Sequence, residues 1–470
     1  MGRKKDLPLL EKVRITDIGA GGNALARIDN QVIFVPMLIP GDVVDLKVVR
    51  KRKKYLIGSV VRFHEYSPDR IKPVCRHFGT CGGCNWQHLP YELQLKYKEK
   101  QVIDNLIRIG KTDIPEVDPI IGSPDIYFYR NKLEYAFSDR RWLTREEMLS
   151  ANDYEGEDAL GFHIPGFFDR VLDIRECHLQ PDPSGAIRDS IRRYAHKKEM
   201  RFFNQRQQTG FLRNLIIRNS GDGKIMVIVV FFHDEPERIK ALMDHIVSEF
   251  HQVSSLMYII NSKKNDSIYD QHPVLYYGDD HLTETMDGLK FRIGPRSFCQ
   301  TNTRQALRLY HVAMEFARLK GRETVYDLYS GTGTIANFIA RSAGKVIGIE
   351  SIEEAVEDAR INASMNNINN VYFFAGDIKD VLSGEFITVN GKPDVIITDP
   401  PRAGMHSDVV RTILNAAPDR IVYISCNPAT QSRDIFSLSD SYFVVKVQPV
   451  DMFPQTHHVE NVVLLKIKQI

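Results

Sequence analysis

The spacing of hydrophobic residues changes twice along the chain and predicts three regions of different architecture. From residue 13 to residue 63, short apolar stretches alternate with turns that contain Gly, Asn and Pro. Short strands at such regular spacing are typical of a small β-barrel. The strands are expected at residues 13–15, 24–28, 31–35, 42–49 and 56–61.

The middle of the chain predicts a mixed α+β region. A polar stretch with helical spacing of its apolar residues covers residues 91–109 and stops at Gly110, which favours one helix. Shorter apolar runs then predict strands at residues 132–137, 215–218, 225–232 and 255–261.

Beyond about residue 291 strand-like and helical stretches alternate, which predicts a parallel, doubly wound sheet. Its strands are expected at residues 324–328, 346–350, 371–375, 395–398 and 421–425, with a terminal pair at 443–447 and 461–467. This layout is similar to that of Rossmann-like, S-adenosylmethionine-dependent class I methyltransferases. We therefore expect a multidomain protein with a β-barrel over residues 5–65, a central α+β domain over 66–290 and an α/β domain over 291–470.

Composition excludes several other classes of protein. Hydrophobic residues make up 43% of the 470 and charged residues 26%, and no apolar run is long enough to span a bilayer. The first residues, Met-Gly-Arg-Lys-Lys-Asp, lack the apolar core of a signal peptide. We expect a cytoplasmic protein that has no membrane partner and works as a monomer.

The net charge of +2 hides two basic clusters, at residues 50–54 and 192–198. Most such runs are solvated surface. Because these two flank a group of cysteines, they favour a polyanionic partner. With its length and its basic hairpin, the N-terminal barrel resembles a TRAM domain, an RNA-binding barrel of the oligonucleotide-binding type.

A glycine-rich turn after the first strand of the α/β region predicts a nucleotide-like cofactor. Gly331 and Gly333 allow a tight turn, and the helix that follows points free N–H groups at a ligand. Glu350 ends the next strand, at nearly the spacing at which a carboxylate accepts hydrogen bonds from ribose hydroxyls. Asp377, after the third strand, can accept from an adenine amino group or serve only as a helix N-cap.

Two further strand ends carry reactive side chains. Cys426 ends an apolar strand, and Asp399 begins a rigid Asp-Pro-Pro-Arg turn. A thiol can add to C6 of uracil and make C5 a nucleophile toward a methyl sulfonium, after which a base removes the C5 proton. Glu460 is the expected base, because the strand it precedes runs beside that of Cys426 in this topology. Taken singly, Cys426 is more often a structural thiol and Glu460 a surface acid.

These motifs resemble those of the RNA 5-methyluridine methyltransferase family. The similar segments lie at residues 297–302, 399–404, 425–430 and 458–460. The resemblance implies that Cys426 is the nucleophile, that Glu460 is the base and that Gln300 touches the methionine end of S-adenosylmethionine. It also implies a cofactor site lined by Tyr329, Glu350, Asp377 and Asp399. Cys299 and Ser330 depart from the family pattern, and neither position has a catalytic role.

Four cysteines outside these motifs are candidate metal ligands: Cys75, Cys81, Cys84 and Cys177. Four thiolates suit either tetrahedral zinc or a [4Fe–4S] cluster. Their three-plus-one spacing favours the cluster and resembles the iron–sulfur site in the ribosomal-RNA branch of the family. The resemblance implies a cluster that is structural or helps to hold RNA.

Taken together, the sequence predicts an enzyme that methylates C5 of a specific uridine in 23S rRNA. The target base has to leave its stack to reach a thiol. Tyr129, which has cations beside it, is expected to stack on a base, with a surface patch at a helix start as the alternative. We prefer ribosomal RNA because the tRNA branch of the family lacks the barrel and the cysteine cluster. Two alternatives stay open: a tRNA uridine-C5 methyltransferase with added domains, and a non-catalytic RNA-binding assembly factor.

Overall fold

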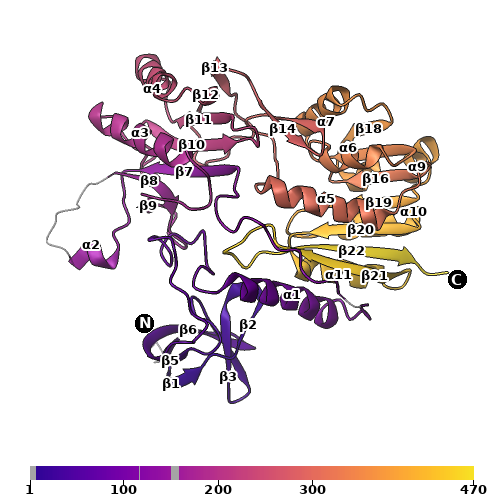
Figure 1. Cartoon of the computed structure of the whole chain (residues 1–470), viewed down its shortest axis with the longest axis horizontal. Helices are drawn as coiled ribbons and strands as arrows, with labels where there is room; N and C mark the ends of the chain where they lie inside the picture. Colours follow the sequence, from indigo (N-terminus) through magenta and orange to yellow (C-terminus); the bar gives the residue numbers. More distant parts are fainter. Residues whose placement is uncertain (1–6, 116, 150–157, 470) are drawn as a thin grey trace.

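The computed structural model describes residues 7–115, 117–149 and 158–469, and its strands form three large sheets and one hairpin (Figure 1). Residues 5, 6 and 470, which bound two of the expected domains, lie outside the described residues, as does most of the N-terminal segment considered above as a signal peptide. Within the described part of the chain no helix is both long and apolar enough to cross a membrane.

The N-terminal sheet has six strands in the order β1-β5-β6-β4-β3-β2. Apolar side chains that alternate along the strands, such as Ala24, Ala26, Ile33 and Val35, fill its core. The expected strands are present, although the first begins earlier than predicted and a two-residue strand was not foreseen. The elements are β1 (Leu9–Arg14), β2 (Asp17–Ile18), η1 (Ala20–Gly22), β3 (Ala24–Ile28), β4 (Gln31–Val35), β5 (Val43–Lys51) and β6 (Tyr55–Glu65).

The central sheet has seven strands in the order β13-β12-β11-β10-β7-β8-β9, and only β11 and β12 run parallel among its pairs. Two helices, α3 and α4, supply Ile187, Ile191, Leu242 and Met243 to its core. All four predicted strands are found, most of them longer than expected. The elements are β7 (Lys132–Ser138), α2 (Arg145–Leu149), β8 (Ala159–His163), β9 (Val171–Asp173), α3 (Ser184–Lys197), β10 (Leu212–Asn219), β11 (Ile225–Phe231), α4 (Pro236–Glu249), β12 (Val253–Ile260) and β13 (Val274–Gly278).

The C-terminal sheet has seven strands in the order β18-β17-β16-β19-β20-β22-β21. The first five are parallel, and β22 pairs antiparallel with both β20 and β21. This is the predicted doubly wound arrangement with its terminal pair. The elements are α5 (Thr303–Ala317), β16 (Thr324–Leu328), α6 (Thr334–Ala340), β17 (Lys345–Glu350), α7 (Glu353–Met365), β18 (Val371–Ala375), α8 (Ile378–Val381), α9 (Gly384–Asn390), β19 (Val395–Thr398), α10 (Ser407–Ala416), β20 (Arg420–Ser425), α11 (Pro428–Leu438), β21 (Tyr442–Val450) and β22 (Glu460–Ile467).

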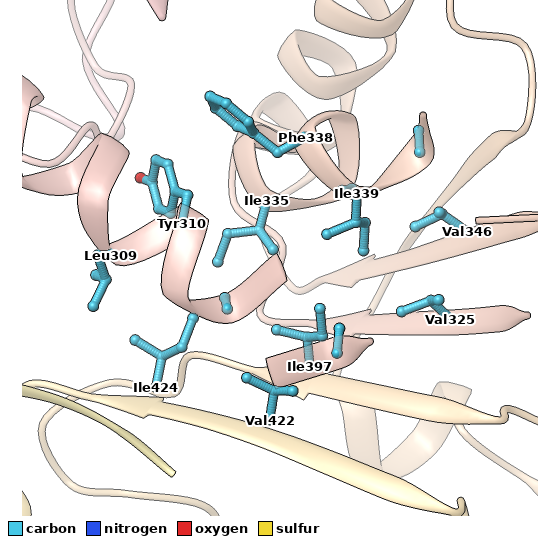
Figure 2. Packing of buried hydrophobic residues seen from close by; sticks show 14 of the residues in the cluster. Leu309, Tyr310, Val325, Ile335, Phe338, Ile339, Val346, Ile397, Val422 and Ile424 are labelled. Atoms are coloured by element: carbon cyan, nitrogen blue, oxygen red, sulfur yellow. The ribbon is translucent and has the colours of Figure 1, made fainter. Parts of the chain in front are cut away.

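Alternate residues of each C-terminal strand point to opposite faces of the sheet, and both faces are covered. Helices α5, α6 and α7 pack on the face that carries Val325, Ile397 and Val422. Figure 2 shows Tyr310, Phe338 and their neighbours closing over these strand residues. Helices α8, α10 and α11 cover the other face. The inner strands of the sheet are therefore buried on both sides, whereas the edge strands β18 and β21 keep exposed side chains such as Tyr372 and Phe443.

Two elements assigned by sequence to the central region pack against the C-terminal sheet. Helix α1 (Tyr91–Arg108) places Val102 and Leu106 in the core that contains Tyr326 and Tyr423. The hairpin β14 (Leu282–Met286) and β15 (Leu289–Ile293) adds Met286 and Phe291 to the opposite core. We propose that the C-terminal domain begins before β14 and that α1 is its N-terminal cover.

Candidate active site

Four neighbouring strands of the C-terminal sheet meet at one of its edges. Strands β16, β19 and β20 run parallel and end there, and β22, which is antiparallel to β20, begins there. Asp399 follows β19, Cys426 follows β20, and Glu460 is the first residue of β22. Polar side chains from separate parts of the sequence therefore gather at the carboxyl ends of the parallel strands, where open α/β sheets bind ligands.

Cys426 and Glu460 face each other across the β20–β22 pair. Ser425 pairs with Asn461, so the next residues toward the edge are Cys426 and Glu460. The thiol is half-buried, while Glu460 is 3% exposed. Asn427 caps α11 by accepting from the Ala429 N–H at 3.2 Å, which fixes the turn that presents the thiol. The predicted nucleophile and base are thus neighbours.

Burial and mutual repulsion raise the pKa values of Cys426, Glu460 and Asp399. Burial first, then the negative charges of Glu460 and Asp399, raise the pKa of the Cys426 thiol to about 11. Burial and the Asp399 carboxylate raise the pKa of Glu460, and burial raises the pKa of Asp399. Two buried carboxyl groups this close share their protons, so the pair holds groups able to accept and return a proton near neutral pH.

Arg402 is the cation of this edge. Its guanidinium acts against the carboxylates by lowering the pKa of both Cys426 and Glu460. The backbone carbonyl of Arg402 accepts hydrogen bonds from the Asn427 side chain at 3.0 Å and from the Thr430 hydroxyl at 3.2 Å. The loop that follows β19 is therefore tied to the loop that carries the thiol.

The glycine turn after β16 has the geometry expected of a cofactor loop. Tyr329 has φ +63° and Gly333 has φ +74°, and an added Cβ at Gly333 would lie 2.7 Å from Phe373. Glu350 holds the turn, because its Oε2 accepts from the Gly331 N–H at 3.0 Å. Its Oε1 accepts from the Ser351 N–H at 2.8 Å and the Ile352 N–H at 3.1 Å. This carboxylate is fixed at the mouth of the turn.

Two further predicted cofactor residues, Asp377 and Gln300, come from other segments of the chain. Asp377 caps α8 by accepting from the Lys379 N–H at 3.2 Å and pairs with the Lys379 ammonium at 3.0 Å, and its side chain is 51% exposed. The alternative of a helix N-cap is thus realised, and the exposed oxygens leave room for another donor. Gln300 lies before α5, with its backbone carbonyl accepting from the Asn131 side chain at 2.9 Å.

Buried polar groups without partners surround the glycine turn, and the sequence did not single them out. Among the described residues, neither carboxylate oxygen of Asp327 has a hydrogen-bond partner within normal geometry, nor does the Ser330 hydroxyl or the Asn337 carbonyl oxygen. Burial, and then Asp399, raise the pKa of Asp327 well above its usual range. Orphaned buried groups are costly unless a ligand satisfies them. An acid just before a Gly-x-Gly turn is a signal that could have identified Asp327.

Comparison with known proteins gives the family. Residues 219–468 match the family described as tRNA (Uracil-5-)-methyltransferase, and residues 11–61 match the TRAM domain. The chain belongs to this methyltransferase family. The predicted TRAM barrel is confirmed, as is the predicted class of methyltransferase fold.

Relatives of this chain match it over nearly their whole lengths. Two proteins named uncharacterized RNA methyltransferases, from Bacteroides thetaiotaomicron and Porphyromonas gingivalis, are 56% and 54% identical and cover 96% of this chain and 100% and 99% of their own. A solved structure of Pyrococcus abyssi tRNA (uracil-54, C5)-methyltransferase in complex with S-adenosyl-L-homocysteine has a TM-score of 0.75. It is 28% identical and covers 97% of this chain and 100% of that chain.

The methyltransferase places its four predicted metal ligands around one cavity. Cys75, Cys81, Cys84 and Cys177 all line a cavity of about 590 Å³, which also reaches Phe298 and Arg218. All four are free thiols, and burial raises the pKa of Cys81 to about 11 and of Cys84 to about 12. No group of three or more His, Cys, Asp or Glu residues in the described ranges has the geometry needed to hold a single metal ion.

One RNA contact predicted from sequence is wrong. Tyr129 is only 8% exposed, and its hydroxyl donates to the Pro454 carbonyl at 3.0 Å. Its ring is part of the packing behind the site and cannot stack on a base. Phe298, on the cavity wall, is 69% exposed, so its ring is open to contact with another molecule, which the sequence did not predict. Periodicity could not distinguish the two rings, because both lie in irregular segments.

Proposed function

We propose that this enzyme transfers a methyl group from S-adenosylmethionine to C5 of a specific uridine in 23S rRNA, through a covalent bond between Cys426 and C6, and so produces 5-methyluridine. The observation that carries the proposal is the pairing of Cys426 with Glu460 across β20 and β22, beside Asp399 and the glycine turn. A half-buried thiol, a buried acid and a cofactor loop at one sheet edge are what C5 methylation of uracil requires.

In this mechanism the Cys426 sulfur, as thiolate, bonds to C6, and the C5–C6 π electrons move toward O4 to give an enolate. Arg402 favours the thiolate by its charge. When bound, S-adenosylmethionine supplies the methyl group to C5 and leaves as S-adenosylhomocysteine. Glu460 then takes the C5 proton, the C5–C6 double bond re-forms, and the thiolate leaves with the electrons of the C–S bond.

Several residues fit the cofactor. The Pyrococcus abyssi relative was solved with S-adenosyl-L-homocysteine, which supports the same site here. The orphaned carboxylate of Asp327 suits the ammonium of the methionine end, beside Gln300. Glu350 Oε2, which accepts from the Gly331 N–H, can accept one further hydrogen bond from a ribose hydroxyl. Gly331 leaves open space for a ligand, because an added Cβ there would meet no atom within 4 Å. Tyr329, Gly333, Asp377 and Asp399 complete the proposed site.

Replacing Glu350 by alanine should weaken binding of S-adenosylhomocysteine about 10- to 100-fold, because ribose loses a charged acceptor and the glycine turn loses its tie to β17. Isothermal titration calorimetry measures the change. Glu353→Ala, which removes an exposed acid from the first turn of α7, is the control and should bind with unchanged affinity. Equal affinities of the two variants would contradict the role of Glu350.

The nature of the RNA is the open part of the proposal. The basic hairpin of the barrel and the four cysteines support ribosomal RNA by resemblance. The Pyrococcus abyssi tRNA (uracil-54, C5)-methyltransferase covers 97% of this chain, so the domain layout alone does not separate the two substrates. A tRNA uridine-C5 methyltransferase is therefore the second candidate.

A direct test uses RNA in which uridine is replaced by 5-fluorouridine. Fluorine at C5 cannot be removed as a proton, so the enzyme should be trapped on its substrate as a covalent complex stable to denaturing electrophoresis. With S-adenosylmethionine present, transcribed 23S rRNA should give the complex and a transcribed tRNA pool should not. The reverse result would make tRNA the substrate, and no complex with either RNA would overturn the covalent mechanism.

We infer that the cysteine cavity holds a [4Fe–4S] cluster in preference to a single zinc ion. The four thiols line it together with other possible ligands, among them His77, His163, His178, Glu134 and Glu176, so the three-plus-one spacing of the cysteines is what favours the cluster. We propose that Cys75, Cys81, Cys84 and Cys177 hold the cluster, which ties the segment before α1 to the central sheet. No step of the methyl transfer passes through it. The free thiols of the described cysteines also support a reducing compartment, in which we place the enzyme as a monomer.

Metal analysis tests this assignment. Protein purified without oxygen should contain about four iron atoms and four sulfides per chain. Cys81→Ser together with Cys177→Ser should lose the iron and lower the melting temperature. One zinc per chain and no iron would make the site a zinc centre instead.

A further inference from the structure

Asp451 is the first residue of the loop that leads from β21 to Glu460, and two side chains of α1 hold it. Lys98 donates to its Oδ1 at 2.6 Å, and Tyr91 donates to its Oδ2 at 2.8 Å. The side chains of Lys98 and Asp451 are both 0% exposed. Lys98 also donates to the Phe453 carbonyl at 3.0 Å. The ion pair is therefore fully enclosed where α1 meets the loop of residues 451–459.

The backbone at Asp451 is held as firmly as its side chain. Its carbonyl accepts from the Gln305 amide at 2.7 Å, and its N–H donates to the Ile121 carbonyl at 2.9 Å. The next carbonyl, of Met452, accepts from Asn302 at 3.1 Å. Asn302 and Gln305 begin α5, directly after the segment that contains Gln300. Asp451 therefore links α1, the start of α5 and the β21–β22 hairpin.

The same loop contains a strained residue that α1 and the segment before it hold in place. Gln455 has φ +68°, a left-handed conformation that few residues with a side chain adopt. The N–H groups of Asn85 and Trp86 both donate to its carbonyl at 3.0 Å. The amides of Gln455 and Gln94 exchange hydrogen bonds at 3.0 and 2.9 Å. Strain of this kind persists only where the surroundings enforce it, and it concentrates at functional sites.

A fully buried ion pair gives little net stability, because removing both charges from water costs about as much as their attraction returns. The ion pair here instead fixes the position of the backbone next to Glu460. Val450, the residue before Asp451, pairs directly with Glu460. A shift of Asp451 would therefore move the last rung of the hairpin that carries Glu460. Cys426 is presented by a separate turn, capped by Asn427.

We propose that Asp451, clamped by Lys98 and Tyr91, is a positioning residue that aims Glu460 at the C5 proton. The inference rests on the proposed function and adds that positioning of the base is separate from positioning of the nucleophile. Loosening the clamp slows release of the enzyme from its methylated adduct and leaves the addition of Cys426 to C6 unchanged.

The test follows one turnover on transcribed 23S rRNA with S-adenosylmethionine, quenched in denaturant. Electrophoresis measures the covalent complex, and 5-methyluridine in free RNA measures its resolution. In Tyr91→Phe and Asp451→Ala the complex should form at the wild-type rate and decay at least tenfold more slowly. Asp451→Asn, which still offers an oxygen to Lys98, should recover most of the decay rate. Deuterium at C5 should slow the decay further in the two impaired variants.

Tyr442→Phe is the matched control, because Tyr442 is a buried tyrosine of β21 at the end far from the site, with its hydroxyl on the Pro418 carbonyl. It should decay at the wild-type rate even where its melting temperature falls as much as that of Tyr91→Phe. Equal decay in Tyr91→Phe, Asp451→Ala and wild type would overturn the positioning role while the proposed function stands. No complex of the wild-type enzyme with 5-fluorouridine RNA, and no 5-methyluridine in ordinary RNA, would overturn the proposed function itself, and the inference with it.

Discussion

Replacing Cys426 by alanine should reduce methylation of the target uridine by at least ~10³-fold, because the covalent step has no other nucleophile at this edge of the sheet. Among the described residues, the charged side chains that act on the thiol are Glu460, Asp399 and Arg402. None of these can add to C6 and later leave as readily as a thiolate. Incorporation of labelled methyl from S-adenosylmethionine into 23S rRNA measures the loss.

The same variant separates an enzyme from an RNA-binding assembly factor. Cys426→Ala should keep the wild-type melting temperature and affinity for S-adenosylhomocysteine, since the thiol is half-buried and makes no predicted cofactor contact. It should also form no complex with 5-fluorouridine RNA. Cells that carry only this variant should lose 5-methyluridine at the target position. Unchanged 5-methyluridine in those cells would show that the chain works without catalysis.

The C-terminal sheet could be predicted from sequence because its strands are short apolar runs that alternate with helical stretches. Parallel strands of this kind end at a common edge, so the topology alone placed Cys426 beside Glu460. The register of β20 and β22 agrees with that expectation. The limits of the domains are harder to predict from sequence, because α1 and β14–β15 pack on a sheet whose strands follow them in the chain. Local pattern carries no information about which sheet a helix will cover.

Other features needed three-dimensional contacts. The sequence could not show that Tyr129 is buried under Pro454, because an exposed and a buried tyrosine look alike in an irregular segment. Lys98 lies in a helix whose sequence is largely polar, and it meets Asp451 more than 350 residues away. Asp327 lies in β16, just before the glycine turn, but only its burial without a hydrogen-bond partner shows that it belongs to the site. In each case the sequence does not show whether the side chain has a hydrogen-bond partner from a distant part of the chain.

Replacing Glu460 by glutamine should slow turnover about 10²- to 10⁴-fold by a different route from the loss of Cys426. Glutamine keeps the size of the side chain but cannot take a proton. Addition and methyl transfer should proceed, so the methylated adduct should accumulate on ordinary uridine RNA, without fluorine. Because Glu460 is 3% exposed and repelled by Asp399, the neutral amide should leave the melting temperature equal or slightly higher.

The pH dependence of the wild-type enzyme provides an independent check on Glu460. Burial and Asp399 raise the pKa of Glu460, so the carboxyl group is a proton acceptor only after the pair has lost a proton. Decay of the adduct should therefore accelerate as pH rises through the range in which the pair ionises. In Glu460→Gln this rise should disappear, and in Cys426→Ala combined with Glu460→Gln no adduct should form. If Glu460→Gln resolved its adduct at the wild-type rate, another group would have to remove the proton. Asp399 would be the first candidate, because it is also a buried carboxyl group.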